Sequence, residues 1–199
     1  AMVPFDREVS VVAVRSHEGE CRFWPLTENL HQSGILSVSR PLLNDPLQAL
    51  AEDHCRRLLE ALDYVGVLAL ELFQTRDGGL LANEMAPRVH NSGHWTMNGA
   101  VTSQFENHLR AVQGLPLGDT HAIAPTCMVN VIGREPASAD VLRLPNAHLH
   151  RYDKSERAGR KLAHINLTAS THEVLFKQVQ ACAALMPDAP APRFSFTRR

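Results

Sequence analysis

The chain has 199 residues, enough for one domain or one and a half, and its 44% of hydrophobic residues excludes disorder over most of its length. A formal net charge of −1 excludes a nucleic-acid surface that depends on bulk positive charge. No apolar run is long enough to predict a membrane span, and no leader peptide is expected. The four cysteines form no CxxC pair, so we expect reduced thiols in a cytoplasmic protein.

The first expected element is a β-hairpin. Residues 8–15 and 21–26 are rich in strand formers, and the polar residues 16–20 predict the turn between them. Residues 29–34 are expected to form a loop and residues 35–39 a short strand. Because the chain begins almost inside a strand, we expect it to be a fragment of a longer protein.

A helix is expected next. Asp45 can cap its N-terminus, and Pro46 at the first helical position costs no hydrogen bond. The following apolar positions at helical spacing predict a face made of Leu47, Ala51, His54, Leu58 and Leu62. Residues 65–72 then form a nearly continuous apolar run, which predicts a strand buried on both faces.

A second hairpin brings two carboxylates together. Asp77 and Gly78 are typical of a two-residue turn, so that residues whose numbers sum to 155 should pair across the strands. Glu71 and Glu84 would then lie directly opposite, with Cβ atoms about 5 Å apart. Two like charges at the end of an apolar strand call for a divalent cation, and oxygen ligands favour Mg²⁺ or Mn²⁺ beside phosphates. The alternative, that each glutamate pairs with its own arginine, remains open.

Residues 86–101 follow no secondary-structure period and are expected to form a functional loop. Ser103 and Glu106 then predict a capping box, and the helix is expected to end at Gly114. Its apolar face should contain Phe105, Leu109 and Val112.

The C-terminal third is expected to add three strands, residues 126–132, 147–152 and 162–167, with a basic loop at residues 154–161. Ser170 and Glu173 predict the cap of a last helix. Its buried face should contain Leu175, Val179, Cys182 and Met186. The predicted fold class is α+β, mostly an antiparallel sheet with packed helices and a small C-terminal β-rich subdomain.

Histidines offer weaker signals. His90 and His94 have the spacing of a zinc helix, but Pro87 and Gly93 argue against a helix there. A cluster near the basic loop is more often a set of partly buried, hydrogen-bonded side chains than a metal site; it contains His148, His150 and His164. Trp95 is as compatible with packing as with function.

Several segments resemble 5-(carboxyamino)imidazole ribonucleotide synthetases of the ATP-grasp superfamily. The motif NEMAPRVHNSGHW within residues 66–117 carries the resemblance most specifically. The segments VPFDREVS, PLTENLHQSGIL and HLHRYDKSERAGRKLAHINLT match as well, so the resemblance is colinear from Val3 to Thr168. It implies a ligase of purine biosynthesis that uses ATP and bicarbonate to carboxylate 5-aminoimidazole ribonucleotide through carboxyphosphate.

The resemblance also implies roles for individual residues. Glu71 and Glu84 match magnesium ligands, Asn83 lies beside the phosphates, and Glu8 and His31 match positions that contact the nucleotide. The hinge that binds adenine through its backbone would contain Ala1, Met2 and Val3. The group around bicarbonate and the acyl phosphate would contain Arg88, His90 and Asn91. The imidazole ribonucleotide would be bound by Lys154, Arg160 and Lys161.

By the same resemblance, residues 1–118 would be the C-terminal part of an ATP-grasp domain and residues 119–199 a subdomain that carries the basic loop. The N-terminal domain and most of the ATP lid would be absent, so we expect the chain alone to be inactive. A homodimer is implied. Two alternatives from other classes remain open, a non-catalytic dimerisation or scaffold module, and a metal-dependent hydrolase. The hydrolase would use Glu71, Glu84, His90 and His94 as ligands.

Overall fold

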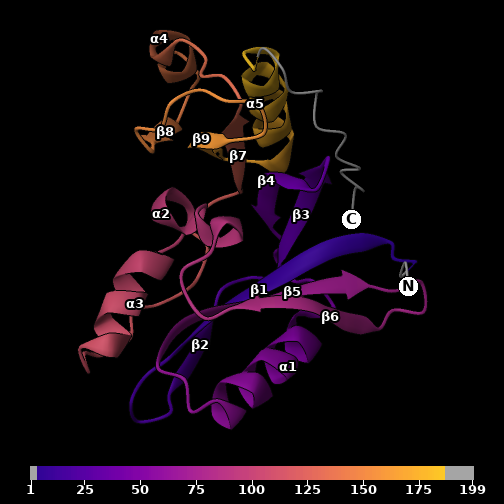
Figure 1. Ribbon diagram of the computed structural model, residues 1–199, viewed down its shortest axis with the longest axis vertical. Helices are drawn as coiled ribbons and strands as arrows, with labels where there is room; N and C mark the ends of the chain where they lie inside the picture. Colours follow the sequence, from indigo (N-terminus) through magenta and orange to yellow (C-terminus); the bar gives the residue numbers. More distant parts are fainter. Residues whose placement is uncertain (1–3, 187–199) are drawn as a thin grey trace.

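The computed structural model describes residues 4–186, so that the expected adenine hinge (Ala1, Met2 and Val3) and residues 187–199 lie outside the described residues. One nine-stranded sheet organises this part of the chain, in the order β6-β5-β1-β3-β4-β7-β9-β8, with β2 paired to β1 (Figure 1). All strand pairs are antiparallel, which confirms the expected α+β class. None of the described helices is long and apolar enough to cross a membrane.

The strands are β1 (Arg7–Arg15), β2 (Cys21–Phe23), β3 (Thr27–Gln32), β4 (Ile35–Pro41), β5 (Gly66–Gln74), β6 (Leu80–Ala86), β7 (Thr126–Ile132), β8 (Ala147–Arg151) and β9 (Lys161–Thr168). The helices are α1 (Gln48–Ala61), the 3₁₀ turn η1 (Asn91–Gly93), α2 (Thr96–Gly99), α3 (Gln104–Val112), α4 (Ser138–Leu142) and α5 (His172–Ala184).

The two faces of β1 and β5 are covered by different helices. Figure 1 shows α1 beneath these strands and α2 and α3 on the other side. Successive side chains of a strand alternate between faces. One face packs on α1 through a cluster that includes Val9, Val11, Ala13, Leu68, Leu70 and Leu72. The opposite face packs on the α2–α3 side through Val12, Val14, Val67 and Ala69. The strand predicted at residues 65–72 is therefore buried on both faces, as expected.

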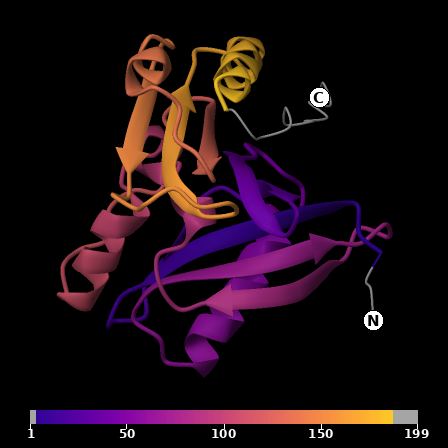
Figure 2. The same ribbon diagram turned by 45° about the horizontal axis from the view of Figure 1, so that its top comes forward.

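The C-terminal strands form a second core. The strands β7 and β9 pack against α5, and Figure 2 shows this region together with α4 and α5 above the N-terminal strands. The predicted buried face of the last helix, Leu175, Val179, Cys182 and Met186, belongs to this cluster. Its predicted cap is wrong by one residue, because the Thr171 side chain, not Ser170, accepts the hydrogen bond from the Val174 amide at 3.2 Å.

Three other local predictions are wrong. Residues 29–32 are not loop but part of β3, because their backbone pairs with β4 on one side while Asn29 also pairs with β1 on the other. The first helix begins at Gln48, since the Asp45 carboxylate caps a turn through the Leu47 amide at 3.0 Å instead of capping the helix. Its buried residues are Ala51, Cys55 and Leu59, whereas the predicted Leu62 is 48% exposed.

The orientation of α3 also differs from the prediction. The Ser103 side chain caps it as predicted, accepting from the Glu106 amide at 3.1 Å. The helix nevertheless buries Gln104, Asn107 and Ala111. The predicted apolar face points to solvent, with Phe105, Leu109 and Val112 exposed by 36%, 57% and 44%.

Candidate nucleotide and metal site

The two predicted carboxylates are direct partners across β5 and β6, since Glu71 pairs with Glu84. The pairing was predicted correctly, but the two-residue turn from which it was predicted is not present. Thr75 pairs with Gly79 around a three-residue turn, in which Gly78 takes a positive φ of 84°, and this shifts the register by one. A bulge at Asn83 shifts it back, because Leu72 pairs with Ala82 while Glu71 pairs with Glu84. The two shifts cancel at the glutamates.

A cavity of about 480 Å³ opens at this hairpin. Its polar lining includes Glu8, His31, Glu71, Asn83, Glu84, His90 and Lys161. The cavity therefore brings together seven of the predicted site residues from β1, β3, β5, β6, β9 and the loop after β6. In the part of the chain that the structure describes, no arginine forms an ion pair with Glu71 or Glu84, which removes the structural alternative for this pair.

The charge of Glu71 is poorly compensated. Burial, the Glu84 carboxylate and the Glu8 carboxylate together raise the pKa of Glu71 to about 7, against a smaller lowering effect of Lys161. Burial in turn lowers the pKa of Lys161, although Glu71 favours its charged form. The two neighbouring carboxylates disfavour the ionised form of Glu71. A bound cation would favour that form, so it would stabilise the site. Glu71 and Glu84 fit such an ion.

His90 lies at the same place, and ligand atoms of Glu71, Glu84 and His90 lie within 4.8 Å of one another. Its Nε2 is 3.6 Å from Glu71 Oε1, too far for a good hydrogen bond. Burial lowers the pKa of His90 to about 4, so the imidazole is neutral at pH 7. A neutral imidazole leaves the carboxylate charge uncompensated and is available as a ligand or as a donor, depending on its tautomer.

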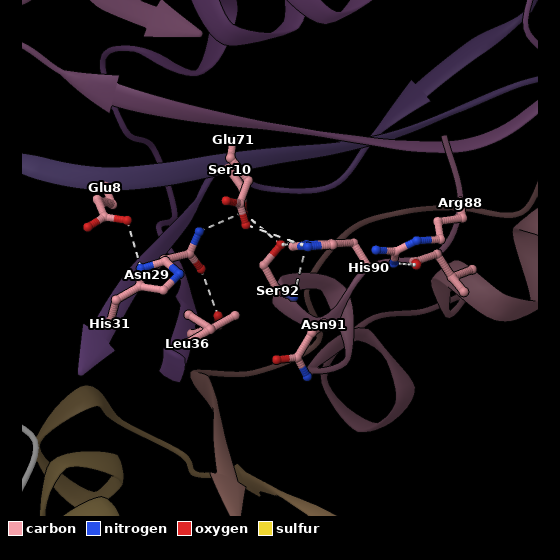
Figure 3. Close-up of polar contacts among 12 residues, drawn as sticks. Glu8, Ser10, Asn29, His31, Leu36, Glu71, Arg88, His90, Asn91 and Ser92 are labelled. Carbon is pink, nitrogen blue, oxygen red and sulfur yellow. Dashed lines mark hydrogen bonds and ion pairs between the residues drawn. The ribbon is translucent and has the colours of Figure 1, made fainter. Parts of the chain in front are cut away.

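A buried chain of hydrogen bonds supports His90, and sequence reasoning missed it (Figure 3). Ser92 Oγ lies 2.9 Å from His90 Nδ1 and 2.9 Å from Ser10 Oγ. Asn29 donates to Ser10 Oγ at 2.9 Å and accepts from Ser39 Oγ at 2.7 Å. The residues come from β1, β3, β4 and η1. Ser10 could have been predicted, because it lies two residues after Glu8 on β1 and both side chains therefore point to the same face of the sheet.

Two of the nucleotide-contact predictions lie side by side. His31 Nδ1 is 2.7 Å from Glu8 Oε2, across the β1–β3 region of the cavity (Figure 3). His31 lies on β3 and not in a loop, so its position is set by the sheet. Asn83 lines the same cavity from the bulge of β6.

Three further residues that the sequence singled out, Arg88, Asn91 and Trp95, do not line the cavity. The Arg88 guanidinium donates to the Val89 carbonyl at 2.9 Å and is one cause of the lowered pKa of His90. Asn91 exchanges two side-chain hydrogen bonds with Asn130 of β7, at 3.0 and 2.6 Å, and so links the loop to the second core. Trp95 is fully buried and donates to Thr27 Oγ1, which favours packing.

Of the basic loop, only Lys161 reaches the cavity lining. Lys154 Nζ lies 5.2 Å from the centre of the Tyr152 ring, as in a cation–π pair. Arg160 donates to Ser155 Oγ at 2.9 Å and to the Ser155 carbonyl at 3.3 Å. Both side chains therefore hold the loop itself in this structure.

The histidine cluster is partly satisfied by hydrogen bonds and stacking, although among the described residues His164 Nε2 is buried without a hydrogen-bond partner. His150 and His164 stack with ring centres 4.5 Å apart, and the ring of His94 lies 4.9 Å from that of His164. Tyr152 Oη is 2.8 Å from His164 Nδ1, and Asn98 Oδ1 is 2.8 Å from His150 Nε2. Burial lowers the pKa of His164 to about 2. His94 joins this cluster rather than the carboxylates, so the four-ligand set of the hydrolase alternative is not formed.

An antiparallel sheet whose hairpin presents two carboxylates to a polar cavity is the arrangement of an ATP-grasp protein. The family model described as "ATP-grasp domain" matches residues 1–105, and the one described as "Phosphoribosylaminoimidazole carboxylase C-terminal domain" matches residues 126–178. A Pseudomonas aeruginosa N5-carboxyaminoimidazole ribonucleotide synthase is 54% identical over 184 residues, or 92% of this chain. The Escherichia coli enzyme of that name is 50% identical over 187 residues, or 93% of the chain. The chain belongs to the N5-carboxyaminoimidazole ribonucleotide synthase family.

Solved structures agree with this assignment. The synthetase from Thermus thermophilus superposes with a TM-score of 0.90 and 54% identity over 95% of this chain. An Aspergillus clavatus synthase, solved in complex with ADP and 5-aminoimidazole ribonucleotide, gives a TM-score of 0.87 and 31% identity over 93% of the chain. The chain spans about half the length of its relatives, 51% of the P. aeruginosa protein and 53% of the T. thermophilus chain.

Proposed function

We propose that the chain forms the metal-binding and nucleotide-binding half of a ligase that carboxylates 5-aminoimidazole ribonucleotide with ATP and bicarbonate. The observation that carries the proposal is the direct pairing of Glu71 and Glu84 in one cavity without an arginine partner. Because the pKa of Glu71 is raised to about 7, a divalent cation would find a site whose charge the fold leaves uncompensated.

Each residue of the cavity then has a role. Glu71 and Glu84 would hold Mg²⁺, or Mn²⁺, which supplies charge neutralisation for the phosphates when bound. Glu8 and His31 would accept and donate hydrogen bonds to the nucleotide, and Asn83 would contact its phosphates. Ala1, Met2 and Val3 would provide backbone contacts to adenine.

The second group of residues would serve bicarbonate and the ribonucleotide. Arg88 would bind bicarbonate and the acyl phosphate through a planar pair of donors, with His90 and Asn91 beside it. The ribonucleotide phosphate would be bound by Lys154, Arg160 and Lys161 after the basic loop closes. Lys161 already lines the cavity, which supports its place in this group.

The proposed division of the chain places the nucleotide part at residues 1–118 and the part with the basic loop at residues 119–199. The two family matches support it, because the first ends at residue 105 and the second begins at residue 126. The separate core of β7, β9 and α5 supports it as well. A cytoplasmic location is consistent with these substrates and with the four unpaired cysteines, Cys21, Cys55, Cys127 and Cys182.

A chimera tests the activity. The chain is joined to the half of the P. aeruginosa relative that it does not match, and phosphate release from ATP is measured. We expect release that requires both bicarbonate and 5-aminoimidazole ribonucleotide, whereas the 199 residues alone should be inactive. Absence of this release in a folded chimera, while the intact P. aeruginosa enzyme is active, would favour the non-catalytic module.

The partner proposed for the exposed face of α3 is a second copy of the chain. This face, which we call the α3 face, consists of Val101, Phe105, Leu109, Val112 and Leu115, exposed by 36–57%. Glu106 and Arg110 flank it and form an ion pair within one helix, 2.5 Å apart. Antiparallel pairing of two α3 helices would place Glu106 of each against Arg110 of the other and Phe105 against Val112, so the face is complementary to itself.

Sedimentation analysis tests the α3 face. We expect the chain to be a dimer, Leu109→Glu to give a monomer, and Leu142→Glu to remain a dimer. Leu142 is a matched control because it is 60% exposed at the end of α4, outside the α3 face. A monomeric wild-type chain, or a Leu109→Glu dimer, would contradict the proposal.

A further inference from the structure

The hydrogen bonds behind His90 run in one direction, and that direction determines what its ring can do in the cavity. A neutral imidazole has one N–H and one lone pair, and only the lone pair can bind a metal ion. The Nδ1 atom of His90 faces Ser92, whereas Nε2 faces Glu71 in the cavity lining. The position of one proton therefore decides whether His90 is a third metal ligand or a hydrogen-bond donor.

The backbone of η1 makes Nδ1 of His90 an acceptor. His90 is the N-cap residue of η1, and its side chain accepts from the Ser92 amide, whose nitrogen lies 3.4 Å from Nδ1. A backbone amide can only donate. If Nδ1 carried the proton, two N–H groups would face each other between residues that are both buried. The proton of His90 therefore lies on Nε2.

The side chain of Asn29 gives the same answer from the other end of the chain of hydrogen bonds (Figure 3). Its Oδ1 accepts from Ser39 Oγ at 2.7 Å, so its Nδ2, which can only donate, faces Ser10 Oγ at 2.9 Å. Ser10 has a single hydroxyl proton, and it donates this proton to Ser92 Oγ at 2.9 Å. The single hydroxyl proton of Ser92 is then left for His90 Nδ1, also at 2.9 Å.

Burial keeps this chain of hydrogen bonds in one direction. Ser10, Ser39 and Ser92 are fully buried, and Asn29 is 6% exposed. Their side chains are held by β1, β4, η1 and β3, so the sheet fixes their positions. Because a buried hydroxyl cannot turn towards water, reversing one of these bonds would require reversing all of them.

The Nε2–H group of His90 is an unused donor at the cavity. It lies 3.6 Å from Glu71 Oε1, beyond hydrogen-bonding distance, and it has no hydrogen-bond partner among residues 4–186. His90 itself lines the cavity, so the donor faces the space that a ligand would occupy. Since Nδ1 is engaged by Ser92 and Nε2 carries the proton, neither nitrogen offers a lone pair to a cation.

We propose that these buried side chains, which we call the serine–asparagine relay, are positioning residues that keep the proton of His90 on Nε2. The relay consists of Ser39, Asn29, Ser10 and Ser92. His90 then donates to an anionic oxygen of the carboxylate, carbonate or phosphate type and leaves the metal ion to the two carboxylates. The inference rests on the proposed function, because bicarbonate and the acyl phosphate derived from it are the anions that this ligase would hold there.

Nitrogen-15 NMR of the 199-residue chain measures the tautomer without any activity. At pH 8 we expect the His90 signals of a neutral ring protonated on Nε2. In Asn29→Asp an ionised carboxylate accepts from both neighbouring serines, so the relay should run the other way and His90 should shift towards the Nδ1–H form.

Ser37→Ala is the matched control for the NMR measurement. Ser37 is buried on the same strand as Ser39, but its hydroxyl donates to the Leu30 carbonyl at 2.8 Å and lies outside the relay. The tautomer of His90 should be the same in this variant as in the wild type. A wild-type ring protonated on Nδ1, or an unchanged tautomer in folded Asn29→Asp, would overturn the proposal.

Calorimetric titration with Mn²⁺ tests whether His90 is kept away from the metal ion. His90→Phe should bind Mn²⁺ about as tightly as the wild-type chain does, because neither nitrogen of His90 is free to bind it. A loss of about tenfold or more, the usual effect of disturbing a ligand, would overturn the proposal. If the wild-type chain binds no Mn²⁺, the proposed function fails, and the NMR result still decides on the relay.

Kinetics of the chimera test the donor role. Asn29→Asp should lower kcat about 10²-fold, the usual effect of losing one donor to a developing oxyanion. Ser37→Ala should retain the activity. An unchanged kcat in Asn29→Asp, together with a shifted tautomer, would show that the Nε2–H group serves no anion and would overturn the donor role. An inactive parent chimera with the expected tautomer would contradict the proposed function and not the relay.

Discussion

The carboxylate hairpin and the basic loop are two ends of the proposed site, and they are built differently. On the hairpin, Glu71 is 12% exposed on β5 and is held opposite Glu84 of the edge strand β6, with its pKa raised to about 7. On the loop between β8 and β9, Lys154 is exposed and the Arg160 side chain bonds to Ser155 of the same loop. The loop is also joined to the segment after β7, because the Gly133 amide donates to the Arg160 carbonyl and the Glu135 amide donates to the Glu156 carboxylate, each at 2.9 Å. The hairpin therefore carries an electrostatic cost that a bound cation would relieve, whereas the side chains of Lys154 and Arg160 have contacts within or beside their own loop.

The difference shows that the fold fixes the metal-binding side chains more tightly than those proposed to bind the substrate. A group that must hold a metal ion gains from a rigid position even when that position is unfavourable without the ion. A group that must enclose a substrate gains from mobility, which exposed side chains keep. Variants at the two ends should accordingly fail in different ways.

The largest effect is expected at Glu84. Glu84→Ala removes a cation ligand from an exposed position on β6, so phosphate release by the chimera should fall by about 10³-fold or more. The fold should change little, because no core contact is lost. Steady-state kinetics and thermal unfolding of both proteins check this. Asp77→Ala, in the turn of the same hairpin, is the control and should retain activity; comparable activity of Glu84→Ala would contradict the metal role.

A smaller effect of another kind is expected at the basic loop. Arg160→Ala should raise KM for 5-aminoimidazole ribonucleotide about 10- to 100-fold with a smaller change in kcat, because a charged hydrogen bond to a phosphate is lost. The measurement is KM for each substrate separately. Arg157→Ala, on the same loop, serves as the control. An effect on KM for ATP alone would show that Arg160 contacts ATP and not 5-aminoimidazole ribonucleotide, which would contradict the prediction.

Glu71 should show the cost of a carboxylate that has no compensating charge. Its pKa is about 7 in the folded chain and 4.5 ordinarily, so the ionised form is disfavoured, and stability is lost as pH rises from 4.5 through 7. Glu71→Gln should therefore raise the free energy of unfolding at pH 8, without divalent cations, by up to about 3 kcal/mol. At pH 4 the two proteins should be similar. Urea titrations at both pH values check this, and a destabilised Glu71→Gln chain at pH 8 would refute it.

The smallest effect, about 2 kcal/mol between pH 6.5 and pH 5, concerns the histidine cluster. Burial lowers the pKa of His164 to about 2, so the unfolded chain binds a proton below pH 6.5 that the folded chain does not. Stability should therefore fall as pH drops from 6.5, and His164→Phe should lose stability less steeply over that range. His121→Phe, at a side chain that is 85% exposed, is the control and should follow the wild type. Parallel curves for His164→Phe and wild type would exclude this contribution.

Much of the sheet could be predicted from the sequence, because β-rich runs between turn residues have a local cause. The strand predicted at residues 126–132 coincides with β7. The contacts that long-range pairing decides could not be predicted. The residues NLHQ became strand because β1 and β4 lie on either side, and α3 turned its polar residues inward because Gln104 and Asn107 bond to buried backbone groups.

The site shows the same division. Pairing of Glu71 with Glu84 was predicted from a two-residue turn, but it results from a longer turn and a compensating bulge at Asn83, neither of which the sequence encodes in a local pattern. The family motif indicated Arg88, His90 and Asn91. It did not indicate Ser10, Asn29 or Ser92, because their role depends on two strands and a loop meeting in space.

Proton release on cation binding tests the shared metal site most directly. Calorimetric titration of the chain with Mn²⁺ in buffers of different ionisation enthalpy measures it. If Glu71 and Glu84 bind one ion, about half a proton should leave per ion at pH 7, more at pH 6 and almost none at pH 9, because the pKa of Glu71 is about 7. Binding that releases no proton at pH 6, or that is equally tight in Glu84→Ala, would contradict the account.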